Sequence, residues 1–206
     1  MDSITLLYDK QEEIALGISF NYGSNHNMKE LAFAKLHCER LGIQHIVIDL
    51  DFMPRYLKSS LMEGADAIPD GNYDDDNMKS TVVPFRNGIM LSIAVGIAES
   101  HQLKRVYIAN HGGDHAIYPD CRPEFITAID AAAKAGTYIH VGVEAPYTHW
   151  RKEDIALRGH QLGINYAETW SCYKGGKKHC GTCGTCRERK EAFRLAHLQD
   201  PTEYEQ

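Results

Sequence analysis

Segments rich in β-branched and aromatic residues alternate with segments of helical periodicity along most of this chain of 206 residues. Two apolar segments, 14–22 and 43–50, enclose residues 28–41, in which apolar residues recur at three- and four-residue steps. A strand, a helix and a strand at this spacing form a βαβ unit, which requires parallel strands and a right-handed crossover. The sequence therefore predicts a Rossmann-like α/β fold, a parallel sheet with flanking helices.

The same alternation continues toward the C-terminus. It predicts strands at 14–22, 43–50, 105–110 and 138–143, and helices at 1–13, 28–41, 84–97, 123–135, 152–162 and 185–197. Residues 51–81 interrupt the pattern with prolines, glycines and an acidic run, so we expect a long mobile loop there with one helical turn. Ligands of open parallel sheets bind beyond the carboxyl ends of the strands. The candidate site segments are therefore 22–26, the residues after 50, 110–122 and 144–150.

Four of the six cysteines lie in one short segment near the C-terminus, at Cys172, Cys180, Cys183 and Cys186. Glycine occupies the two-residue gaps between the last three and allows the tight turns that bring thiolates to one point. A compact tetrahedral set of thiolates is typical of a closed structural zinc site, and we expect one Zn²⁺ per chain here. An iron–sulfur cluster also fits a Cys-x-x-Cys-x-x-Cys run, and disulfides are a third interpretation.

Basic residues crowd this cysteine segment and would offset the double negative charge of four thiolates on Zn²⁺. They are Lys174, Lys177, Lys178, Arg187, Arg189 and Lys190. His179 could replace one sulfur, although its neighbour Cys180 completes a four-sulfur set without it.

Charge and composition narrow the classes of function. A net charge of −6 and a pI near 6.0 argue against broad, unspecific nucleic-acid binding. No apolar run approaches the length of a membrane span, and the N-terminus lacks the basic region of a signal peptide, so we expect a reducing, cytoplasmic setting. The length suits one domain with an appendage, which we place at 1–165 and 166–206.

Several motifs appear in a fixed order along nearly the whole chain. They are Phe20-Asn21-Tyr22-Gly23, Val83-Pro84-Phe85-Arg86-Asn87, Tyr118-Pro119-Asp120-Cys121-Arg122 and the four-cysteine segment. Together they resemble the 7-cyano-7-deazaguanine synthases, the nitrile-forming ligases of queuosine biosynthesis, although that family usually has Asp where this chain has Asn21. The resemblance implies an N-type ATP pyrophosphatase of the adenine nucleotide alpha hydrolase type. Such an enzyme would convert 7-carboxy-7-deazaguanine, ammonia and ATP to the 7-cyano compound, with bound zinc and with Mg²⁺ on the phosphates.

The N-terminus departs from this family's pattern. The family's ATP loop, Ser-Gly-Gly-x-Asp-Ser, follows the first strand, and here only Met1-Asp2-Ser3 match the end of it. A parallel sheet whose chain starts with a helix also lacks the strand that leads into that helix. We therefore expect that the polypeptide starts upstream, that Met1 is an internal methionine, and that this chain alone binds ATP poorly.

The resemblance also implies roles for individual residues. Asp2 would serve Mg²⁺ or pyrophosphate chemistry, Ser3 a phosphate, and Arg86 a phosphate or the substrate carboxylate. Either Asp120 or Asp114 would accept the paired N–H donors of a guanine-like edge, with Tyr118 or Phe20 stacked on the base. The full ATP-binding set is Met1, Asp2, Ser3, Ile4, Thr5, Leu6 and Leu7, and the substrate-binding set is Phe20, Tyr22, Arg86, Asn87, Asp114, Tyr118, Asp120 and Arg122.

Simpler interpretations of these residues stay open. Asp2 or Ser3 could be a plain N-cap, Arg86 a solvated residue in the first turn of a helix, and Asp120 the cap of an ordinary turn. Cys121 is better explained by packing than by a thioester intermediate. The candidate donors His111, His115 and His149 could equally be surface histidines.

Two other functions fit parts of the pattern. A tRNA-thiolating ATP pyrophosphatase would show a basic face and a catalytic cysteine pair outside the metal site. A zinc-knuckle module that binds nucleic acid would use the α/β domain as a scaffold. The favoured interpretation needs neither nucleic acid nor membrane, and a homodimer is in keeping with the family.

Overall fold

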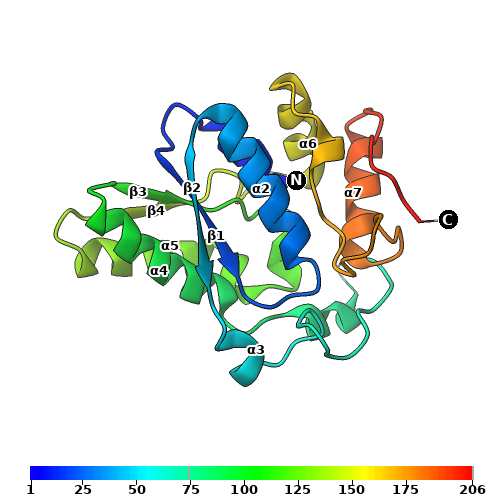
Figure 1. Cartoon of the computed structure of the whole chain (residues 1–206), viewed down its shortest axis with the longest axis horizontal. Coiled ribbons are helices and arrows are strands. Elements are labelled where there is room, and N and C mark those ends of the chain that lie inside the picture. Colours follow the sequence, from blue (N-terminus) through cyan, green and yellow to red (C-terminus); the bar gives the residue numbers. More distant parts are fainter. Residues whose placement is uncertain (74, 206) are drawn as a thin grey trace. The chain divides into compact units, whose positions relative to one another are not determined.

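The computed structural model describes residues 1–73 and 75–205. Its helices are α1 (Asp2–Asp9), α2 (Asn27–Leu41), α3 (Met53–Tyr56), α4 (Arg86–Ser100), α5 (Pro123–Gly136), α6 (Lys152–Gln161) and α7 (Gly184–Leu195) (Figure 1). Short 3₁₀ helices are η1 (Asp76–Thr81), η2 (Gly112–Ala116), η3 (Pro119–Cys121) and η4 (Tyr166–Glu168). The strands are β1 (Leu16–Asn21), β2 (Gln44–Asp49), β3 (Arg105–Tyr107) and β4 (Gly142–Glu144).

The chain divides into two compact units, each with one parallel strand pair. Residues 1–84 and 152–206 form the first unit, and residues 85–151 form the second. β1 pairs with β2 in the first unit, and β3 pairs with β4 in the second. The predicted α/β class and parallel strands are confirmed, but the described strands form two separate pairs rather than one continuous sheet. The predicted boundary between 1–165 and 166–206 stays a prediction.

In the first unit, helices cover the β1–β2 pair and build a small bundle. α2 contacts both strands, while α6 contacts α1 and α7 (Figure 1). Gly159 of α6 allows α1 and α6 to approach closely, because a Cβ there would overlap Tyr166 Oη. That hydroxyl donates to the carbonyl of Ile155 at 3.0 Å and lies 2.8 Å from Thr5 Oγ1, and burial raises the pKa of Tyr166 to about 12. This hydrogen-bonded contact fixes α1 against α6.

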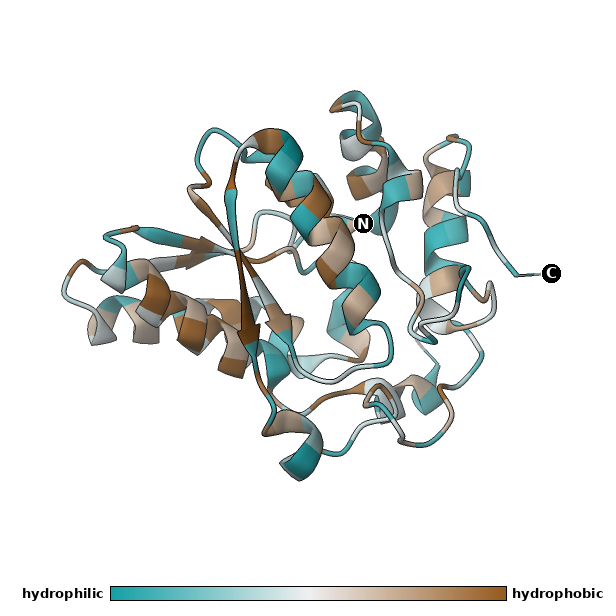
Figure 2. Ribbon diagram, viewed as in Figure 1, coloured by the Kyte–Doolittle hydropathy of each residue, from teal (hydrophilic) through white to brown (hydrophobic). Residues whose placement is uncertain are grey.

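The core of the second unit lies between α4, α5 and the β3–β4 pair. Its buried members are Leu91, Val95, Ala98, Ala133, Val141 and Val143. Figure 2 shows hydrophobic residues concentrated on the strands and on α4. Pairing of β3 with β4 places their carboxyl ends at the same edge of this unit.

Several predicted boundaries change, each for a local reason. β4 is shorter than the predicted 138–143 because His140 has a φ of +53° and the N–H of Val141 donates to Thr137 Oγ1, which makes residues 137–141 a turn. α1 begins at Asp2, so Asp2 and Ser3 lie in its first turn rather than capping it. The 51–81 loop contains two short helices, α3 and η1, where one helical turn was expected.

Residues 76–100 reach the length and hydropathy of a membrane span. The structure divides them between η1 and α4, which are separated by residues 82–85. α4 has 15 residues. It therefore rises about 22 Å, short of the ~30 Å hydrocarbon core of a bilayer. Its buried face packs in the core of the second unit, which accounts for its apolar composition.

Candidate functional site

The four cysteines near the C-terminus converge on one point, as the spacing predicts. Their four Sγ atoms all lie within 4.8 Å of one another. A tetrahedral ion with metal–sulfur bonds of about 2.3 Å requires sulfur–sulfur separations of roughly 3.8 Å, and Cys180 Sγ lies 3.9 Å from Cys186 Sγ. Cys172, Cys183 and Cys186 are fully buried, so this donor set fits a closed structural metal site.

Neighbouring donors favour thiolates at this site. The N–H groups of Thr182 and Cys183 donate to Cys180 Sγ at 3.5 and 3.4 Å, and the N–H of Cys180 donates to Cys172 Sγ at 3.4 Å. Hydrogen bonds from Cys172 and Cys186 lower the pKa of the Cys183 thiol, while the hydrogen bonds within this group raise the pKa of Cys172 and of Cys186. All six cysteines of the chain are free thiols, which disfavours the disulfide interpretation.

His179 lies outside the group of metal-binding sulfurs. Its ring packs on Trp170, with centroids 4.2 Å apart, and its Nε2 accepts the N–H of Ser171 at 3.1 Å. Burial and the charge of Arg189 lower the pKa of His179 to about 4. The imidazole is therefore a neutral packing group beside the site.

Arg189 anchors the cysteine segment to the rest of the first unit. The guanidinium is fully buried and donates to Thr202 Oγ1, Thr169 Oγ1, Ser171 Oγ and the carbonyl of Tyr166, at 2.7 to 3.1 Å. The sequence analysis grouped Arg189 with the basic residues that would offset the thiolate charge, because burial of a charge this well satisfied has no signal in composition.

The other basic residues of the segment have varied partners. Lys178 pairs with Glu203 at 3.0 Å, and Lys190 donates to the carbonyl of Gly181 at 3.1 Å. Whether this group also offsets thiolate charge stays a prediction.

The predicted ATP-binding residues form the first turns of α1. The side chains of Ile4, Thr5, Leu6 and Leu7 are buried in the first unit, so any nucleotide contact there would come from backbone N–H groups at the helix N-terminus. Asp2 Oδ2 accepts a hydrogen bond from Lys152 Nζ at 2.7 Å. The same ammonium lies 3.3 Å from Glu188 Oε2, which gives a half-buried acidic and basic cluster at the start of the helix.

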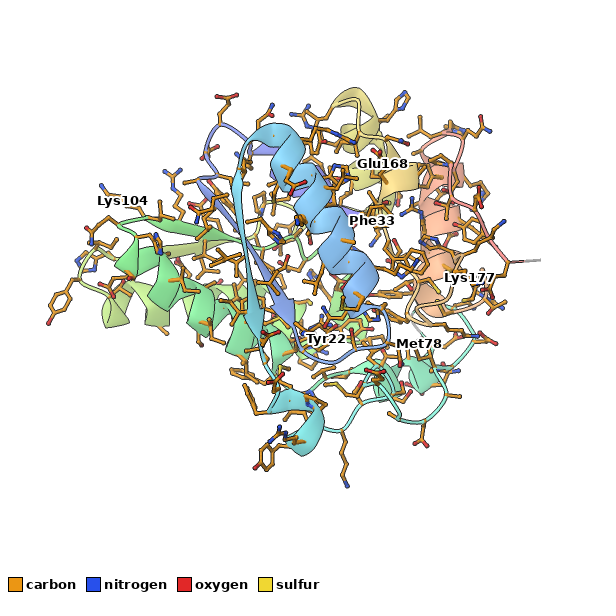
Figure 3. All side chains as sticks on the ribbon, viewed as in Figure 1. Tyr22, Phe33, Met78, Lys104, Glu168 and Lys177 are labelled. Carbon is orange, nitrogen blue, oxygen red and sulfur yellow. The ribbon has the colours of Figure 1, made fainter. Side chains whose placement is uncertain are left out.

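Phe20 and Tyr22 lie at the carboxyl end of β1. Figure 3 labels Tyr22 there, and its side chain is buried. Asn27, the first residue of α2, accepts the N–H of Tyr22 at 2.8 Å and donates to the carbonyl of Phe20 at 3.0 Å. The amide of Asn27 therefore fixes the backbone of the predicted substrate-binding strand end.

A buried polar network joins two of the predicted residues of the second unit, Asn87 and Asp120, with Cys121. Asp120 Oδ2 accepts the N–H of Asn87, in the first turn of α4, at 2.8 Å. Asn87 Nδ2 donates to the carbonyl of Asp120 at 3.2 Å and to Cys121 Sγ at 3.2 Å. Burial, followed by the nearby carboxylates of Asp114 and Asp120, raises the pKa of the Cys121 thiol. The raised pKa keeps Cys121 protonated, in agreement with a packing role rather than a thioester.

Phe85 and Arg86 combine two unfavourable local features. Phe85 has a φ of +55°, a left-handed conformation that costs about 1 kcal/mol or more for a residue with a side chain. Arg86, the first residue of α4, places a cation at the positive end of a helix dipole. The position of Arg86 is expected where an anion binds, since a carboxylate or phosphate there would interact favourably with the guanidinium and with the helix N-terminus.

The other predicted residues of this unit hold the loop after β3. Asp114 Oδ2 accepts the N–H of His111 at 2.9 Å, and His111 Nδ1 accepts the N–H of Gly113 at 3.1 Å, so the two side chains cap η2 reciprocally. Arg122 Nε donates to the carbonyl of His115 at 2.9 Å, and Tyr118 is buried.

Asn110 lies in the candidate segment 110–122, but it was not among the individual residues predicted for the site. It is buried, lies just beyond β3, and donates through Nδ2 to the carbonyl of Cys121 at 2.5 Å and to Thr148 Oγ1 at 3.4 Å. Its Oδ1 is buried and has no hydrogen-bond partner among the described residues. A polar residue at the end of a predicted strand was the available signal, but Asn110 lies between the motifs that carry the family resemblance, after Asn87 and before Tyr118.

Parallel strand pairs flanked by helices define the chain as an α/β protein, and four converging thiols near its C-terminus could hold a metal ion. A family model described as "Queuosine biosynthesis protein QueC" matches residues 1–197, and the chain belongs to this family. The resemblance found from the motifs is confirmed.

Curated relatives named 7-cyano-7-deazaguanine synthase match the whole chain. One from Porphyromonas gingivalis is 62% identical over 205 residues, which cover 100% of this chain and 93% of the relative. One from Desulfotalea psychrophila is 50% identical, and the match covers 99% of this chain and 94% of that relative. One from Caldicellulosiruptor bescii is 48% identical, with 100% and 93% covered.

Proposed function

We propose that the protein is an ATP-dependent carbon–nitrogen ligase that converts 7-carboxy-7-deazaguanine and ammonia to 7-cyano-7-deazaguanine in queuosine biosynthesis. The observation that carries the proposal is the 62% identity, over the full chain, to a relative named 7-cyano-7-deazaguanine synthase. The family match favours this function over tRNA thiolation and over a zinc-knuckle module that binds nucleic acid.

The chemistry explains why ATP is needed. A carboxylate is a poor electrophile, because it lacks a good leaving group. Attack of the carboxylate on the α-phosphate of ATP releases pyrophosphate and forms an acyl adenylate, from which ammonia displaces AMP to give an amide. A second adenylation, on the amide oxygen, followed by loss of AMP and of both amide protons, leaves the nitrile. Such steps depend on positioning and on charge neutralisation more than on a protein nucleophile.

The residues with an anion-binding environment suit this chemistry. We assign Arg86 and the N-terminus of α4 to the substrate carboxylate or a phosphate, and Asp2 and Ser3 to the phosphates and the Mg²⁺ that accompanies ATP. Asp120 or Asp114 remains the proposed acceptor for the base, and the other residues proposed to bind the substrate are Phe20, Tyr22, Asn87, Tyr118 and Arg122. Zn²⁺ is the proposed ion of the four cysteines, in a structural role, and the protein is proposed to be a cytoplasmic homodimer.

The direct test is mass spectrometry of the product made from 7-carboxy-7-deazaguanine, ammonia and ATP. We expect the mass of the nitrile and release of AMP and pyrophosphate, all dependent on ammonia, from a chain extended at its N-terminus, and less product from residues 1–206 alone. An unchanged substrate combined with retardation of RNA in a gel would instead favour the nucleic-acid-binding alternatives.

The unpaired oxygen of Asn110 gives a second, narrower prediction. Because an unsatisfied buried acceptor costs about 1–3 kcal/mol, we propose that Asn110 Oδ1 accepts an N–H of the base edge. The wild-type protein should then prefer the natural acid over its analogue without the 2-amino group by roughly 10- to 100-fold in kcat/KM. The variant Asn110→Leu should lose part of this preference, because the carboxylate proposed for the base also accepts N–H donors of the same edge.

The natural acid and its analogue are compared in the wild-type protein and in Asn110→Leu. A loss of folded protein lowers the rates with both substrates equally, so the ratio of the two rates reports recognition rather than stability. The same preference in the variant and in the wild type would contradict the assignment. Thr127→Ala, an exposed change in α5 of the same unit, serves as the control.

A further inference from the structure

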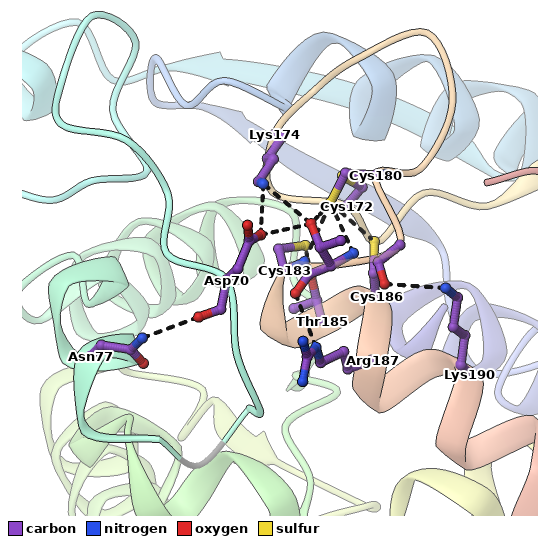
Figure 4. A network of polar contacts seen from close by, with 12 residues as sticks. Asp70, Asn77, Cys172, Lys174, Cys180, Cys183, Thr185, Cys186, Arg187 and Lys190 are labelled. Atoms are coloured by element: carbon purple, nitrogen blue, oxygen red, sulfur yellow. Dashed lines mark hydrogen bonds and ion pairs between the residues drawn. The ribbon is translucent and has the colours of Figure 1, made fainter. Parts of the chain in front are cut away.

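The 51–81 loop makes a specific contact with the four-cysteine segment, and this contact has no role in the proposed reaction (Figure 4). Asp70 Oδ1 accepts hydrogen bonds from Thr182 Oγ1 at 2.6 Å and Lys174 Nζ at 2.7 Å. Asp70 also forms an isolated antiparallel bridge with Cys183, and the N–H of Gly71 donates to the carbonyl of Thr182 at 3.3 Å. The loop therefore pairs with the backbone of the turn that carries the metal-binding thiols.

Thr182 links this contact directly to a metal-binding sulfur. Its N–H and its Oγ1 both lie against Cys180 Sγ, at 3.5 and 3.6 Å, while the same Oγ1 donates to Asp70. A bound ion fixes Cys180, and metal-site turns of this kind lose their geometry when the ion leaves. The position of Thr182, and with it the partner of Asp70, therefore depends on metal binding.

In addition to the exposed contact of Asp70 with Thr182, the loop makes a buried contact with the cysteine segment. Met78 of η1 is buried, and a Cβ built on Gly184 would lie 3.0 Å from Met78 Sδ and 3.2 Å from Tyr73 Cα. Gly184 is the first residue of α7, between two of the cysteines. Asn77 Nδ2 donates to the carbonyl of Asp70 at 3.1 Å, so Asp70 and Asn77 are tied together where this part of the loop rests on the cysteine segment.

The other end of the loop reaches the carboxyl end of β1. The N–H of Asn25 donates to the carbonyl of Leu61 at 3.0 Å, and the N–H of Glu63 donates to the carbonyl of Gly23 at 2.9 Å. Gly175 of the cysteine segment, with a φ of +67°, lies so close to the carbonyl of Asn25 that a Cβ would overlap it. The cysteine segment, the loop and the turn after β1 thus meet at a strand end where α/β proteins bind ligands.

We infer that the four-cysteine metal site orders the 51–81 loop through Thr182 and Asp70, and so positions the turn after β1. Thr182 and Asp70 are positioning residues that act through the metal site. The ion pair of Asp70 with Lys174 adds little, because the Asp70 side chain is 56% exposed. The hydrogen bond to Thr182 and the packing of Met78 on Gly184 carry the coupling.

Hydrogen–deuterium exchange of the metal-loaded protein, followed by mass spectrometry, tests the inference without an activity assay. In Thr182→Val and in Asp70→Ala, amides of residues 70–78 should exchange about tenfold faster than in the wild type, while metal content stays at one ion per chain. Removal of the ion from the wild-type protein by a chelator should raise exchange in the same segment. Asp66→Ala, an exposed change in the same loop, should leave exchange unchanged.

If Thr182→Val lowers the metal content, Asp70→Ala still provides a decisive test. Asp70 lies outside the cysteine segment, so its replacement should leave the ion in place. Gly184→Val provides a third variant, because its side chain would displace Met78 without removing a thiol. Exchange of residues 70–78 that stays at the wild-type rate in metal-loaded Asp70→Ala and Gly184→Val, or that does not respond to the chelator, would overturn the inference.

Discussion

Replacement of Cys183 by serine is expected to abolish metal binding and to unfold the C-terminal part of the first unit. Cys183 is fully buried, and its Sγ is one of four that converge within 4.8 Å. Structural zinc contributes about 10–16 kcal/mol to the folding of zinc-finger peptides, which is comparable to the whole stability of an ordinary domain, about 5–15 kcal/mol. Metal analysis should find one zinc per chain in the wild-type protein and none in the variant.

The consequences should extend beyond the cysteine segment. Arg189 and the loop contact at Asp70 both depend on the geometry of this segment, so loss of the ion should expose protease sites in 51–81 and after residue 166. Thermal unfolding should begin roughly 10 °C or more below that of the wild type. Iron in place of zinc in the wild-type protein would favour the iron–sulfur interpretation.

Cys38→Ala is the matched control. Cys38 is also buried, but it packs beside Gly17 in the first unit and is absent from the converging group. We expect it to keep the ion and to lose only the stability of one small side chain. A Cys183→Ser protein that binds one zinc per chain and unfolds at the wild-type temperature would contradict the structural role of the site.

The sequence could predict those parts of the structure that depend on local patterns. The unit from β1 through α2 to β2 follows from hydrophobic periodicity, and the cysteine group follows from spacing, because both are encoded within a few consecutive residues. The strand predicted at 138–143 began too early in the sequence, because residues 137–141 form a turn. This turn depends on the Thr137 side chain and on the left-handed conformation of His140.

Contacts between distant segments could not be predicted in this way. The full burial of Arg189 could not be predicted from the residues around it in the sequence, because its hydrogen-bond partners Thr202 and Thr169 lie on other segments. The unpaired oxygen of Asn110 depends on the rotamer set by the carbonyl of Cys121, which only coordinates reveal. For the same reason, the contact of Asp70 with Thr182 had no counterpart in the sequence analysis.

Arg86 is the residue of the second unit whose replacement should reduce catalysis most. It follows a residue in the left-handed region and begins a helix of 15 residues, so its guanidinium and the helix N-terminus both favour an anion at the same place. Arg86→Ala should lower kcat/KM for nitrile formation by about 10²–10³-fold, the loss typical when one donor to a developing negative charge is removed.

Further variants and a stability measurement separate a role of Arg86 in catalysis from a role in the fold. Arg86→Lys should restore part of the activity, because it keeps the charge but not the planar pair of donors. Arg105→Ala, an exposed arginine of the same unit, is the control and should keep full activity. If the Arg86→Ala variant is less stable than the wild type but equally active, Arg86 serves the fold and does not belong to the proposed site.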